Sequence, residues 1–330
     1  MVGKEEEMDK VSVIMSTYET PKAYLKNAVD SILAQTYKNL ELIIVCDGSK
    51  EEYEYLKLEY NDDRIKLILN KENKGLPRSL NIGIEKSTGK YIARMDSDDI
   101  SLQNRISDEL DYLRRYDLDI CGSAVTLFGD DKGKKRLLFN SPGEIKIQLL
   151  FRATLVHPTV IGKREIFEQY KYDNSFVCSQ DFELWSRISG DYRIGNYDKC
   201  LLKYRIHKKQ ASVEKSQIQR ELSKKIIKNN ACKITGEYDE KIYKCLWFLS
   251  GREKITKNNC KEFSRMIDYT LKRNHEFHKY DDGLMRKIFY NRFFEQAIKS
   301  EVYVGDLAYF RKILHLYNIM DLCRKLTNRI

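Results

Sequence analysis

Short apolar runs alternate with helix-like patterns over the first hundred residues of the chain. The runs predict four buried strands: Val11–Met15, Leu40–Cys46, Ile65–Leu69 and Tyr91–Met95. Between them apolar residues recur at i, i+3, i+4 and i+7, which predicts amphipathic helices. These helices are Tyr24–Gln35, Glu51–Tyr60 and Leu76–Lys86. Strands that alternate with helices need crossover connections, so the pattern predicts an α/β fold with a mostly parallel sheet.

The pattern changes twice after residue 100. A helix over about Asn104–Tyr116 and a strand over Leu118–Phe128 come first, and the Gly-, Asp- and Lys-rich segment Gly129–Lys135 predicts a mobile loop. From about Val213 glycine becomes rare, proline is absent and helical periodicity continues to Ile330. We therefore expect an α/β domain over 1–213 and a helical region of four or five helices over 214–330.

Composition limits the class of protein. Eight cysteines are scattered over 330 residues without a Cys-x-x-Cys pair, so we expect neither a zinc site nor a disulfide framework. The segment Met1–Lys10 is acidic and polar, unlike a secretory signal. No apolar stretch approaches the roughly 20 residues that span a bilayer. These features predict a cytoplasmic protein.

The charge of the chain is uneven. Residues 214–330 hold 25 Lys/Arg and 15 Asp/Glu, which is the whole net charge of +10, so residues 1–213 are neutral. Such asymmetry predicts either an anionic partner, lipid or nucleic acid, or a solvated basic helical bundle. The pattern Leu307–Ile330 is a basic amphipathic helix, which would lie on the inner membrane face, pack on preceding helices or build a homo-oligomer. A nucleic-acid partner is not favoured, because no recognisable module interleaves aromatic residues with the basic ones.

Candidate chemistry begins with Asp96-Ser97-Asp98-Asp99, directly after the fourth predicted strand. Ligands of open α/β sheets bind beyond the carboxyl ends of the strands. Carboxylates crowded there repel one another and lose solvation unless a cation or a proton compensates. A divalent metal shared with nucleotide phosphates explains them, and a solvated Asp-rich turn is the alternative.

Polar groups also follow the first two predicted strands. Thr17, Tyr18 and Glu19 end the first, and Asp47-Gly48 ends the second, so all should face the same crevice. Asp47 could accept a hydrogen bond from a base N–H while Tyr18 packs against the ring, although Asp-Gly-Ser is also an ordinary turn. Neither Gly-x-Gly-x-x-Gly nor a P-loop occurs, which removes the main support for a dinucleotide oxidoreductase or a P-loop enzyme.

Eight segments in order carry a family resemblance. They are Val11–Tyr18, Asp30–Tyr37, Leu42–Ser49, Asn73–Gly83, Gly89–Asp99, His157–Val160, Gln180–Arg187 and Tyr204–His207. Over about residues 10–210 the chain strongly resembles the inverting glycosyltransferases of family 2. The resemblance implies a GT-A fold with an Asp-x-Asp metal motif, a nucleotide-sugar half over 10–100 and an acceptor half over 101–213.

The resemblance also implies a role for each matching residue. Thr17, Tyr18, Glu19 and Asp47 would hold the nucleoside, Arg78 would lie near the nucleotide, and Asp96 would face the ribose or sugar. Asp98 would ligate Mn²⁺ or Mg²⁺, Asp181 would be the general base, and His207 would complete the metal site or contact the pyrophosphate. The family often has Asp where Cys46 stands and Glu where Gln180 stands. From the residues alone, the alternative for Asp181 is a helix N-cap, which is compatible with catalysis. His157 would equally be a packing or loop-shaping residue, and Trp185 a core residue or a wall of the acceptor pocket.

The function expected from these observations is metal-dependent transfer of a sugar from a nucleotide-diphosphate sugar, UDP-linked by expectation. The acceptor would be a hydroxyl of a surface polysaccharide, a lipid-linked glycan or a glycoprotein glycan. Two alternatives stay open: a sugar-nucleotide nucleotidyltransferase, and a non-catalytic glycan- or membrane-binding module. A nucleotidyltransferase should carry a Gly-rich basic loop after the first strand, which Ser16–Pro21 does not supply.

Overall fold

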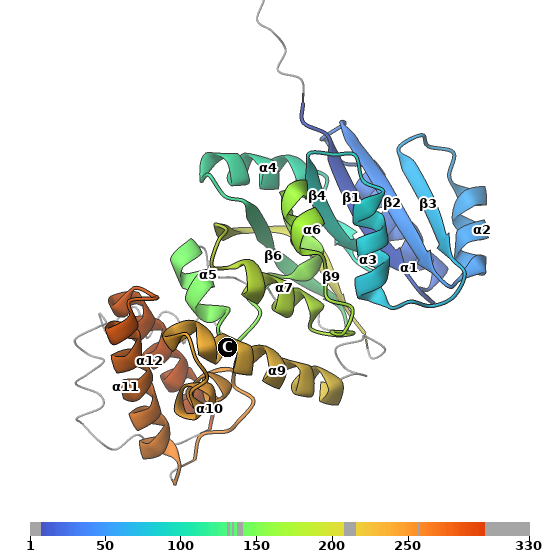
Figure 1. Cartoon of the computed structure of the whole chain (residues 1–330). Coiled ribbons are helices and arrows are strands. Elements are labelled where there is room, and N and C mark those ends of the chain that lie inside the picture. Colours follow the sequence, from blue (N-terminus) through green and yellow to red (C-terminus); the bar gives the residue numbers. More distant parts are fainter. Residues whose placement is uncertain are drawn as a thin grey trace, which may run out of the picture. The chain divides into compact units, whose positions relative to one another are not determined.

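The computed structural model describes residues 8–130, 133, 135–136, 141–207, 216–256 and 258–300. The chain divides into two compact units, Met1–Leu149 with Ala153–Ser223, and Leu150–Arg152 with Lys224–Ile330. The first is an α/β unit and the second is helical (Figure 1). The α/β sheet and the helical region that follows it are therefore as predicted.

Within the described residues, nine strands form one sheet in the order β3-β2-β1-β4-β8-β6-β9-β5, with β7 paired to β6. The strands are β1 Val11–Thr17, β2 Leu40–Asp47, β3 Ile65–Asn70, β4 Tyr91–Asp96, β5 Ile100–Ser101, β6 Ile120–Gly129, β7 Lys135–Arg136, β8 Ile161–Lys163 and β9 Ile194–Ile206. Strands β1 to β4 run parallel. The chain adds β2 and β3 on one side of β1 and then β4 on the other, so the sheet has a topological switch point between β1 and β4.

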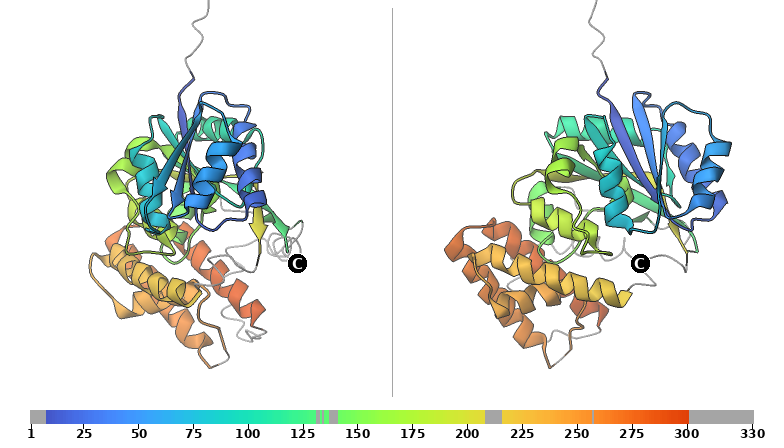
Figure 2. Two further views of the ribbon diagram at one scale, coloured as in Figure 1. Left: turned by 90° about the vertical axis from the view of Figure 1, so that its right-hand side faces the viewer. Right: turned by 45° about the vertical axis from the view of Figure 1, so that its right-hand side comes forward.

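Helices cover both faces of this sheet (Figures 1 and 2). Those of the α/β unit are α1 Lys22–Leu33, α2 Lys50–Glu59, α3 Leu76–Glu85, α4 Arg105–Arg115, α5 Pro142–Gln148, α6 Arg164–Tyr170 and α7 Gln180–Ile188. Alternate residues of β1 point to opposite faces, and Val11, Val13 and Met15 pack with buried residues of α1, α2 and α4. On the other face a Cβ at Gly83 of α3 would lie 2.6 Å from Ile14 Cγ2, so glycine lets this helix approach β1 closely.

The second half of the sheet is less regular than the sequence pattern predicts. Strand β8 runs antiparallel to both β4 and β6. Strand β9 pairs in parallel with β6 across register shifts near Ser123, Ala124 and Val125. The ends of the predicted loop Gly129–Lys135 belong to β6 and β7, and residues 131, 132 and 134 lie outside the described residues. Strands of two or three residues, such as β5, β7 and β8, are too short to show a period in the sequence. Their pairing is therefore determined by the neighbouring strands.

The helical unit contains most of α9 Ser216–Thr235, with α10 Glu240–Leu249, α11 Cys260–Phe277 and α12 Asp282–Lys299. Phe248 of α10 stacks on Phe263 of α11 with ring centroids 3.8 Å apart, so aromatic packing joins two helices. Within the described ranges no helix has both the length and the apolar character needed to cross a bilayer. The predicted basic helix Leu307–Ile330 lies outside the described residues.

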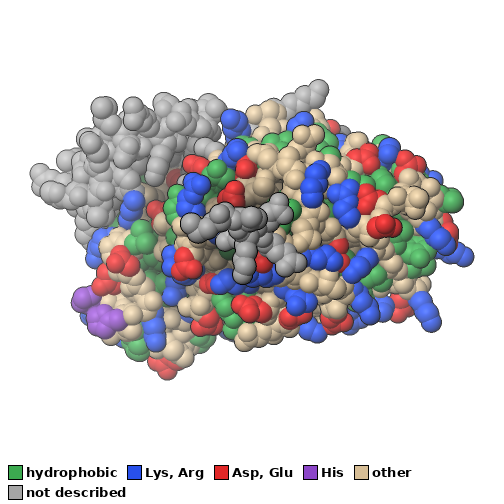
Figure 3. Space-filling view, turned by 90° about the horizontal axis from the view of Figure 1, so that it is seen from above, with side chains coloured by type: hydrophobic (Ala, Val, Ile, Leu, Met, Phe, Trp, Pro, Cys, Tyr) green, Lys and Arg blue, Asp and Glu red, His purple; other side chains and the backbone are tan. Residues whose placement is uncertain are grey.

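The visible surface in Figure 3 mixes both signs of charge, with hydrophobic side chains in small scattered groups.

One acidic side chain, that of Glu41, is buried at the amino-terminal edge of the sheet. Glu41 of β2 is 2% exposed, and its carboxylate binds Ser12 Oγ at 2.6 Å and Lys66 Nζ at 2.7 Å. Burial alone would raise the pKa of Glu41, but hydrogen bonds from Lys66, Ser12, Thr88 and Lys10 lower it to about 2.

This group makes stability depend on pH. The folded-state pKa of Glu41 is depressed, so its stabilisation is complete above the unfolded-state pKa of about 4.3 and is lost as the pH falls through about 2. We expect Glu41→Gln to lower the free energy of unfolding by about 2 kcal/mol at pH 7, after allowing for solvent screening of the two lysines. Urea titrations between pH 7 and pH 3 should show this gap narrowing in acid, and a gap independent of pH would contradict the assignment.

Candidate functional site

The carboxyl ends of β1, β2 and β4 bring the predicted polar groups to one edge of the sheet. Ser16 is in register with Asp96 of β4, and Thr17 is in register with Cys46 of β2. Residues that are 29 and 80 positions apart in sequence therefore end their strands side by side. This edge lies at the switch point between β1 and β4, where open α/β sheets bind ligands.

Asp47 holds the turn that leads into α3. Its Oδ1 accepts hydrogen bonds from Asn70 Nδ2 at 2.8 Å and from the Lys74 N–H at 2.9 Å, and its Oδ2 accepts one from the Gly75 N–H at 2.8 Å. A carboxylate has about four acceptor positions, so one remains on Oδ2. Gly48 is required beside it, because its φ is +86° and a Cβ would lie 2.5 Å from the backbone nitrogen of Asn73.

The loop after β1 is held by a residue that the sequence interpretation missed. Glu52, in the first turn of α2, is 5% exposed, and its Oε1 accepts hydrogen bonds from Thr17 Oγ1 at 3.0 Å and from the Thr20 N–H at 2.6 Å. Thr20 Oγ1 lies 2.8 Å from the Oγ of Ser97. Ser97 is the central residue of the Asp-x-Asp motif, between Asp96 and Asp98. Burial raises the pKa of Glu52, against the effect of these hydrogen bonds. The available signal was Ser49-x-x-Glu52, which by itself indicates only a capping box.

The acidic side chains of Asp96, Asp98 and Asp99 form a cluster, which we call the acidic cluster. Each contributes an oxygen, and these oxygens all lie within 4.8 Å of one another. The end of β9 completes the surroundings: His207 Nε2 lies 2.9 Å from Asp98 Oδ2, and the Arg205 N–H donates to Asp99 Oδ1 at 2.8 Å. The fold thus joins a turn after β4 to residues more than 100 positions later.

The electrostatics of the acidic cluster fit a bound cation. Asp99 is 1% exposed and its Oδ2 is buried without a hydrogen-bond partner. Burial, reinforced by Asp96 and Asp98, raises the pKa of Asp99 well above its usual value. Burial also raises the pKa of Asp96, although Arg94 opposes this through an ion pair. Oxygen ligands crowded in this way, with one oxygen unpaired, match the donor set that Mg²⁺ and Mn²⁺ take.

Asp181 lies in the first turn of α7, one residue after the helix begins. The N-cap is Ser179, which has a left-handed φ of +68°, so Asp181 is not the N-cap. Burial raises the pKa of Tyr172, and the charges of Asp181 and Asp96 add to this effect while the charge of Arg94 opposes it. The two carboxylates therefore act on the same tyrosine.

Tyr172 and His157 form a buried pair near these carboxylates. Their side chains meet at 2.9 Å between Tyr172 Oη and His157 Nε2, and the His157 ring lies edge-on to Trp185 at 6.5 Å. Burial and the charge of Arg94 hold the pKa of His157 well below its usual value, so its ring is neutral. Trp185 is fully buried, which makes it a core residue.

The remaining predicted residues are open to solvent. Tyr18 is 48% exposed, and Glu19 is exposed with a left-handed φ of +53°. Arg78, exposed in the first turn of α3, has no ion-pair partner among the described residues. These three side chains are free to contact a ligand.

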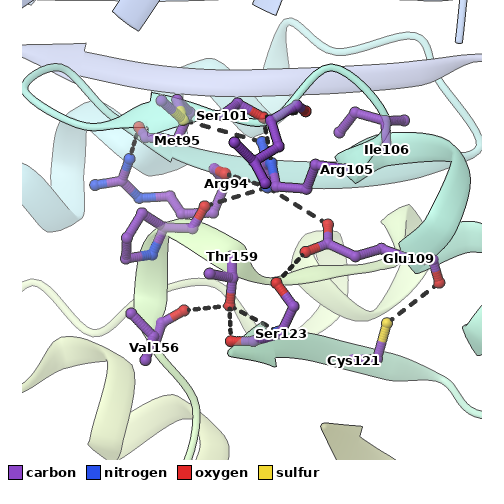
Figure 4. A network of polar contacts seen from close by, with 12 residues as sticks. Arg94, Met95, Ser101, Arg105, Ile106, Glu109, Cys121, Ser123, Val156 and Thr159 are labelled. Carbon is purple, nitrogen blue, oxygen red and sulfur yellow. Dashed lines mark hydrogen bonds and ion pairs between the residues drawn. The ribbon is translucent and has the colours of Figure 1, made fainter. Parts of the chain in front are cut away.

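A buried polar network around Arg105 contacts Arg94 and Met95 of β4, just before the acidic cluster (Figure 4). Arg105 and Glu109 of α4, both fully buried, form an ion pair at 3.4 Å. Arg105 Nη1 also donates to the carbonyl oxygens of Arg94 and Pro158, and Ser123 Oγ donates to Glu109 Oε1 at 2.8 Å. Burial raises the pKa of Glu109 to about 7. The network ties β4, α4, β6 and the turn His157–Thr159 (η1) together, which gives the acidic cluster a rigid support.

A surface hollow of about 520 Å³ lies elsewhere on the α/β unit. It is lined by residues that include Tyr112, Tyr116, Tyr197 and Arg193. None of the predicted site residues lines this hollow. The convergence of polar groups at the strand ends therefore marks the candidate site.

The chain is similar to several known proteins. Residues 12–178 match the family model described as "Glycosyl transferase family 2". An uncharacterized glycosyltransferase of Methanocaldococcus jannaschii is 38% identical over 62% of this chain and 73% of its own length. The O-antigen biosynthesis glycosyltransferase WbnJ of Escherichia coli is 36% identical over 63% of this chain and 84% of its own. The structure of S. aureus TarS 1–349 in complex with UDP-GlcNAc matches with a TM-score of 0.60 at 14% identity, over 89% of this chain and 93% of that one.

Proposed function

The chain belongs to glycosyltransferase family 2, and we propose that it is a metal-dependent inverting enzyme that transfers a sugar from a UDP-sugar to a hydroxyl group of a growing surface glycan. The chain is a glycosyltransferase, and its fold is the GT-A fold expected from the sequence. The proposal goes beyond the family in four respects: metal dependence, the donor sugar, the acceptor and the roles of individual residues.

One observation carries the metal-dependent part of this proposal. Three carboxylates share one strand end, and the buried Asp99 Oδ2 has no hydrogen-bond partner. Burying this oxygen unpaired costs about 1–3 kcal/mol. A divalent cation held by Asp98, with His207 beside it, would offset this cost. When bound, the cation would supply positive charge for the phosphates of the donor and for the leaving nucleoside diphosphate.

The donor contacts are proposed from exposure and remaining bonding capacity. The one acceptor position left on Asp47 suits a single base N–H, and the exposed ring of Tyr18 suits stacking on the base. Thr17 holds the loop that carries Tyr18 through its contacts with Glu52 and Thr20, and the exposed Glu19 suits a contact with the nucleoside. Arg78, a cation without an ion-pair partner among the described residues, suits a phosphate, and Asp96 suits a ribose or sugar hydroxyl.

The transfer step needs one base and no nucleophile from the enzyme. The acceptor oxygen attacks the anomeric carbon as the bond from that carbon to the phosphate oxygen breaks, and the acceptor proton passes to Asp181. Attack from the face opposite the leaving group inverts the anomeric centre. Asp181 lies in α7, in a separate element from the acidic cluster, which fits this division of roles.

The names of similar proteins support the choice of substrates. TarS has been crystallised with UDP-GlcNAc and with UDP, which favours a uridine nucleotide here. WbnJ is named for O-antigen biosynthesis, which favours a surface polysaccharide as acceptor. The excess of basic residues in 214–330 would suit an anionic membrane surface that presents such an acceptor.

A donor screen tests this function directly. The full chain is incubated with UDP-GlcNAc, UDP-glucose, UDP-galactose and GDP-mannose, with Mn²⁺ or with EDTA, and release of nucleoside diphosphate is measured. We expect at least one UDP-sugar to be hydrolysed slowly, only with the metal. Failure with every donor would contradict the proposal, and pyrophosphate release from UTP and a sugar 1-phosphate would favour a nucleotidyltransferase instead.

A further inference from the structure

We propose that the contact between Thr20 and Ser97, held in place by Glu52, couples nucleoside binding to metal binding. Glu52 is then a positioning residue for both parts of the site. This inference rests on the proposed function, because it assigns the loop after β1 to the nucleoside and the turn after β4 to the metal.

The contact joins two loops that are otherwise independent in sequence. Thr20 closes the loop that carries Tyr18 and Glu19, and Ser97 is the central residue between Asp96 and Asp98. The two hydroxyl oxygens lie 2.8 Å apart. Movement of either loop therefore strains or breaks this hydrogen bond unless the other loop follows.

Glu52 determines where Thr20 lies. Its Oε1 receives the Thr20 N–H at 2.6 Å, which fixes the backbone of the loop and not only a side chain. The Thr17 hydroxyl donates to the same Oε1 at 3.0 Å, and its oxygen lies 3.0 Å from Thr20 Oγ1. The chain Glu52–Thr17–Thr20–Ser97 thus links α2, the end of β1 and the turn after β4.

Local helix formation does not account for Glu52. Ser49 already caps α2 by accepting the Glu52 N–H at 3.3 Å, and the Glu52 carboxylate turns away from the helix end toward the loop after β1. Its Oε2 is buried without a hydrogen-bond partner, which costs stability. A residue kept for the helix alone would leave its carboxylate in water.

The consequence is a linkage that passes through the protein. Uridine has no phosphate and so cannot touch a metal on Asp98 through a bridging oxygen. We expect saturating uridine to tighten Mn²⁺ binding to the full chain about fivefold, the lower end of typical coupling between sites. By reciprocity, saturating Mn²⁺ tightens uridine binding by the same factor.

Calorimetric titration of Mn²⁺, with and without uridine, tests this on the wild type and on matched variants. Thr20→Val and Ser97→Ala should each bring the coupling factor to about one, and the double variant should lose no more than either alone. Glu52→Ala should also lose it, whereas Glu52→Gln, which keeps an acceptor oxygen, should retain at least about half of the coupling free energy.

The control is Glu41→Gln, a buried glutamate at the opposite edge of the same sheet, which should keep the wild-type factor. Circular dichroism confirms that each variant is folded. UDP is titrated in parallel. If the wild type binds UDP in a metal-dependent way but uridine does not change its affinity for Mn²⁺, the coupling is overturned and the proposed function is not. Absence of UDP binding would overturn the proposed function, and the coupling with it.

Discussion

Asp181→Asn is expected to lower kcat by about 10³-fold while donor affinity changes less than about twofold. General-base catalysis contributes about 10²–10⁴-fold to rates, and the amide has the shape of the carboxylate but does not take up the acceptor proton. Asp181 lies in α7, apart from the strand ends that would hold the nucleotide, so donor binding should persist. The measurement is transfer to an acceptor under saturating UDP-sugar, with UDP affinity by calorimetry.

Asp191→Asn is the matched control, because Asp191 is an exposed aspartate just after α7. It should leave kcat and UDP affinity at wild-type values. Retention of more than about a tenth of kcat in Asp181→Asn would mean that another group takes the proton. A parallel loss of UDP affinity would instead show that Asp181 supports the donor site.

Asp98→Ala is expected to lower kcat/KM by about 10³-fold and to weaken Mn²⁺ binding by at least about 10-fold. The first figure corresponds to about 4 kcal/mol, within the several kcal/mol that a cation contributes to charge stabilisation. The second follows because even groups that only orient metal ligands change affinity by about 10–100-fold. Removal of Asp98 also leaves His207 without its 2.9 Å partner.

Metal binding is measured by calorimetry, and turnover by UDP release with and without EDTA. The control is Asp111→Ala, an exposed carboxylate of α4 outside the acidic cluster. Turnover in Asp98→Ala that matches the wild type and resists EDTA would refute the metal-dependent mechanism. Loss of turnover with unchanged Mn²⁺ affinity would move the metal site away from Asp98.

The sequence predicted the first half of the sheet well because each element there has a recognisable apolar pattern of its own. Strands such as Leu40–Asp47 are buried on both faces and read as continuous apolar runs, and helices such as Lys22–Leu33 carry one apolar face. The antiparallel strand Ile161–Lys163 was not predicted, because three residues hold no period and the pairing depends on β4 and β6.

The candidate site shows the same division. Thr17, Asp47 and Asp96 were predicted because each ends a strand, and Asp98 because acidic residues crowd there. Glu52 was missed because its sequence context is that of a helix start, while its carboxylate bonds to Thr17 and Thr20, more than 30 positions earlier. Tyr172 was missed because nothing near it in sequence indicates that it meets His157.

The sequence by itself therefore determined the family, the alternation of strands and helices, and the strand-end residues that could hold a nucleotide and a metal. It could do so because period, strand ends and ordered motifs are local properties of the chain. The family resemblance had placed His207 near the metal ligand Asp98, whereas tertiary structure alone decided two other contacts: Glu52 with the loop after β1, and Thr20 with Ser97. These contacts depend on strand order and register, which are determined by packing across the whole sheet rather than by any one segment.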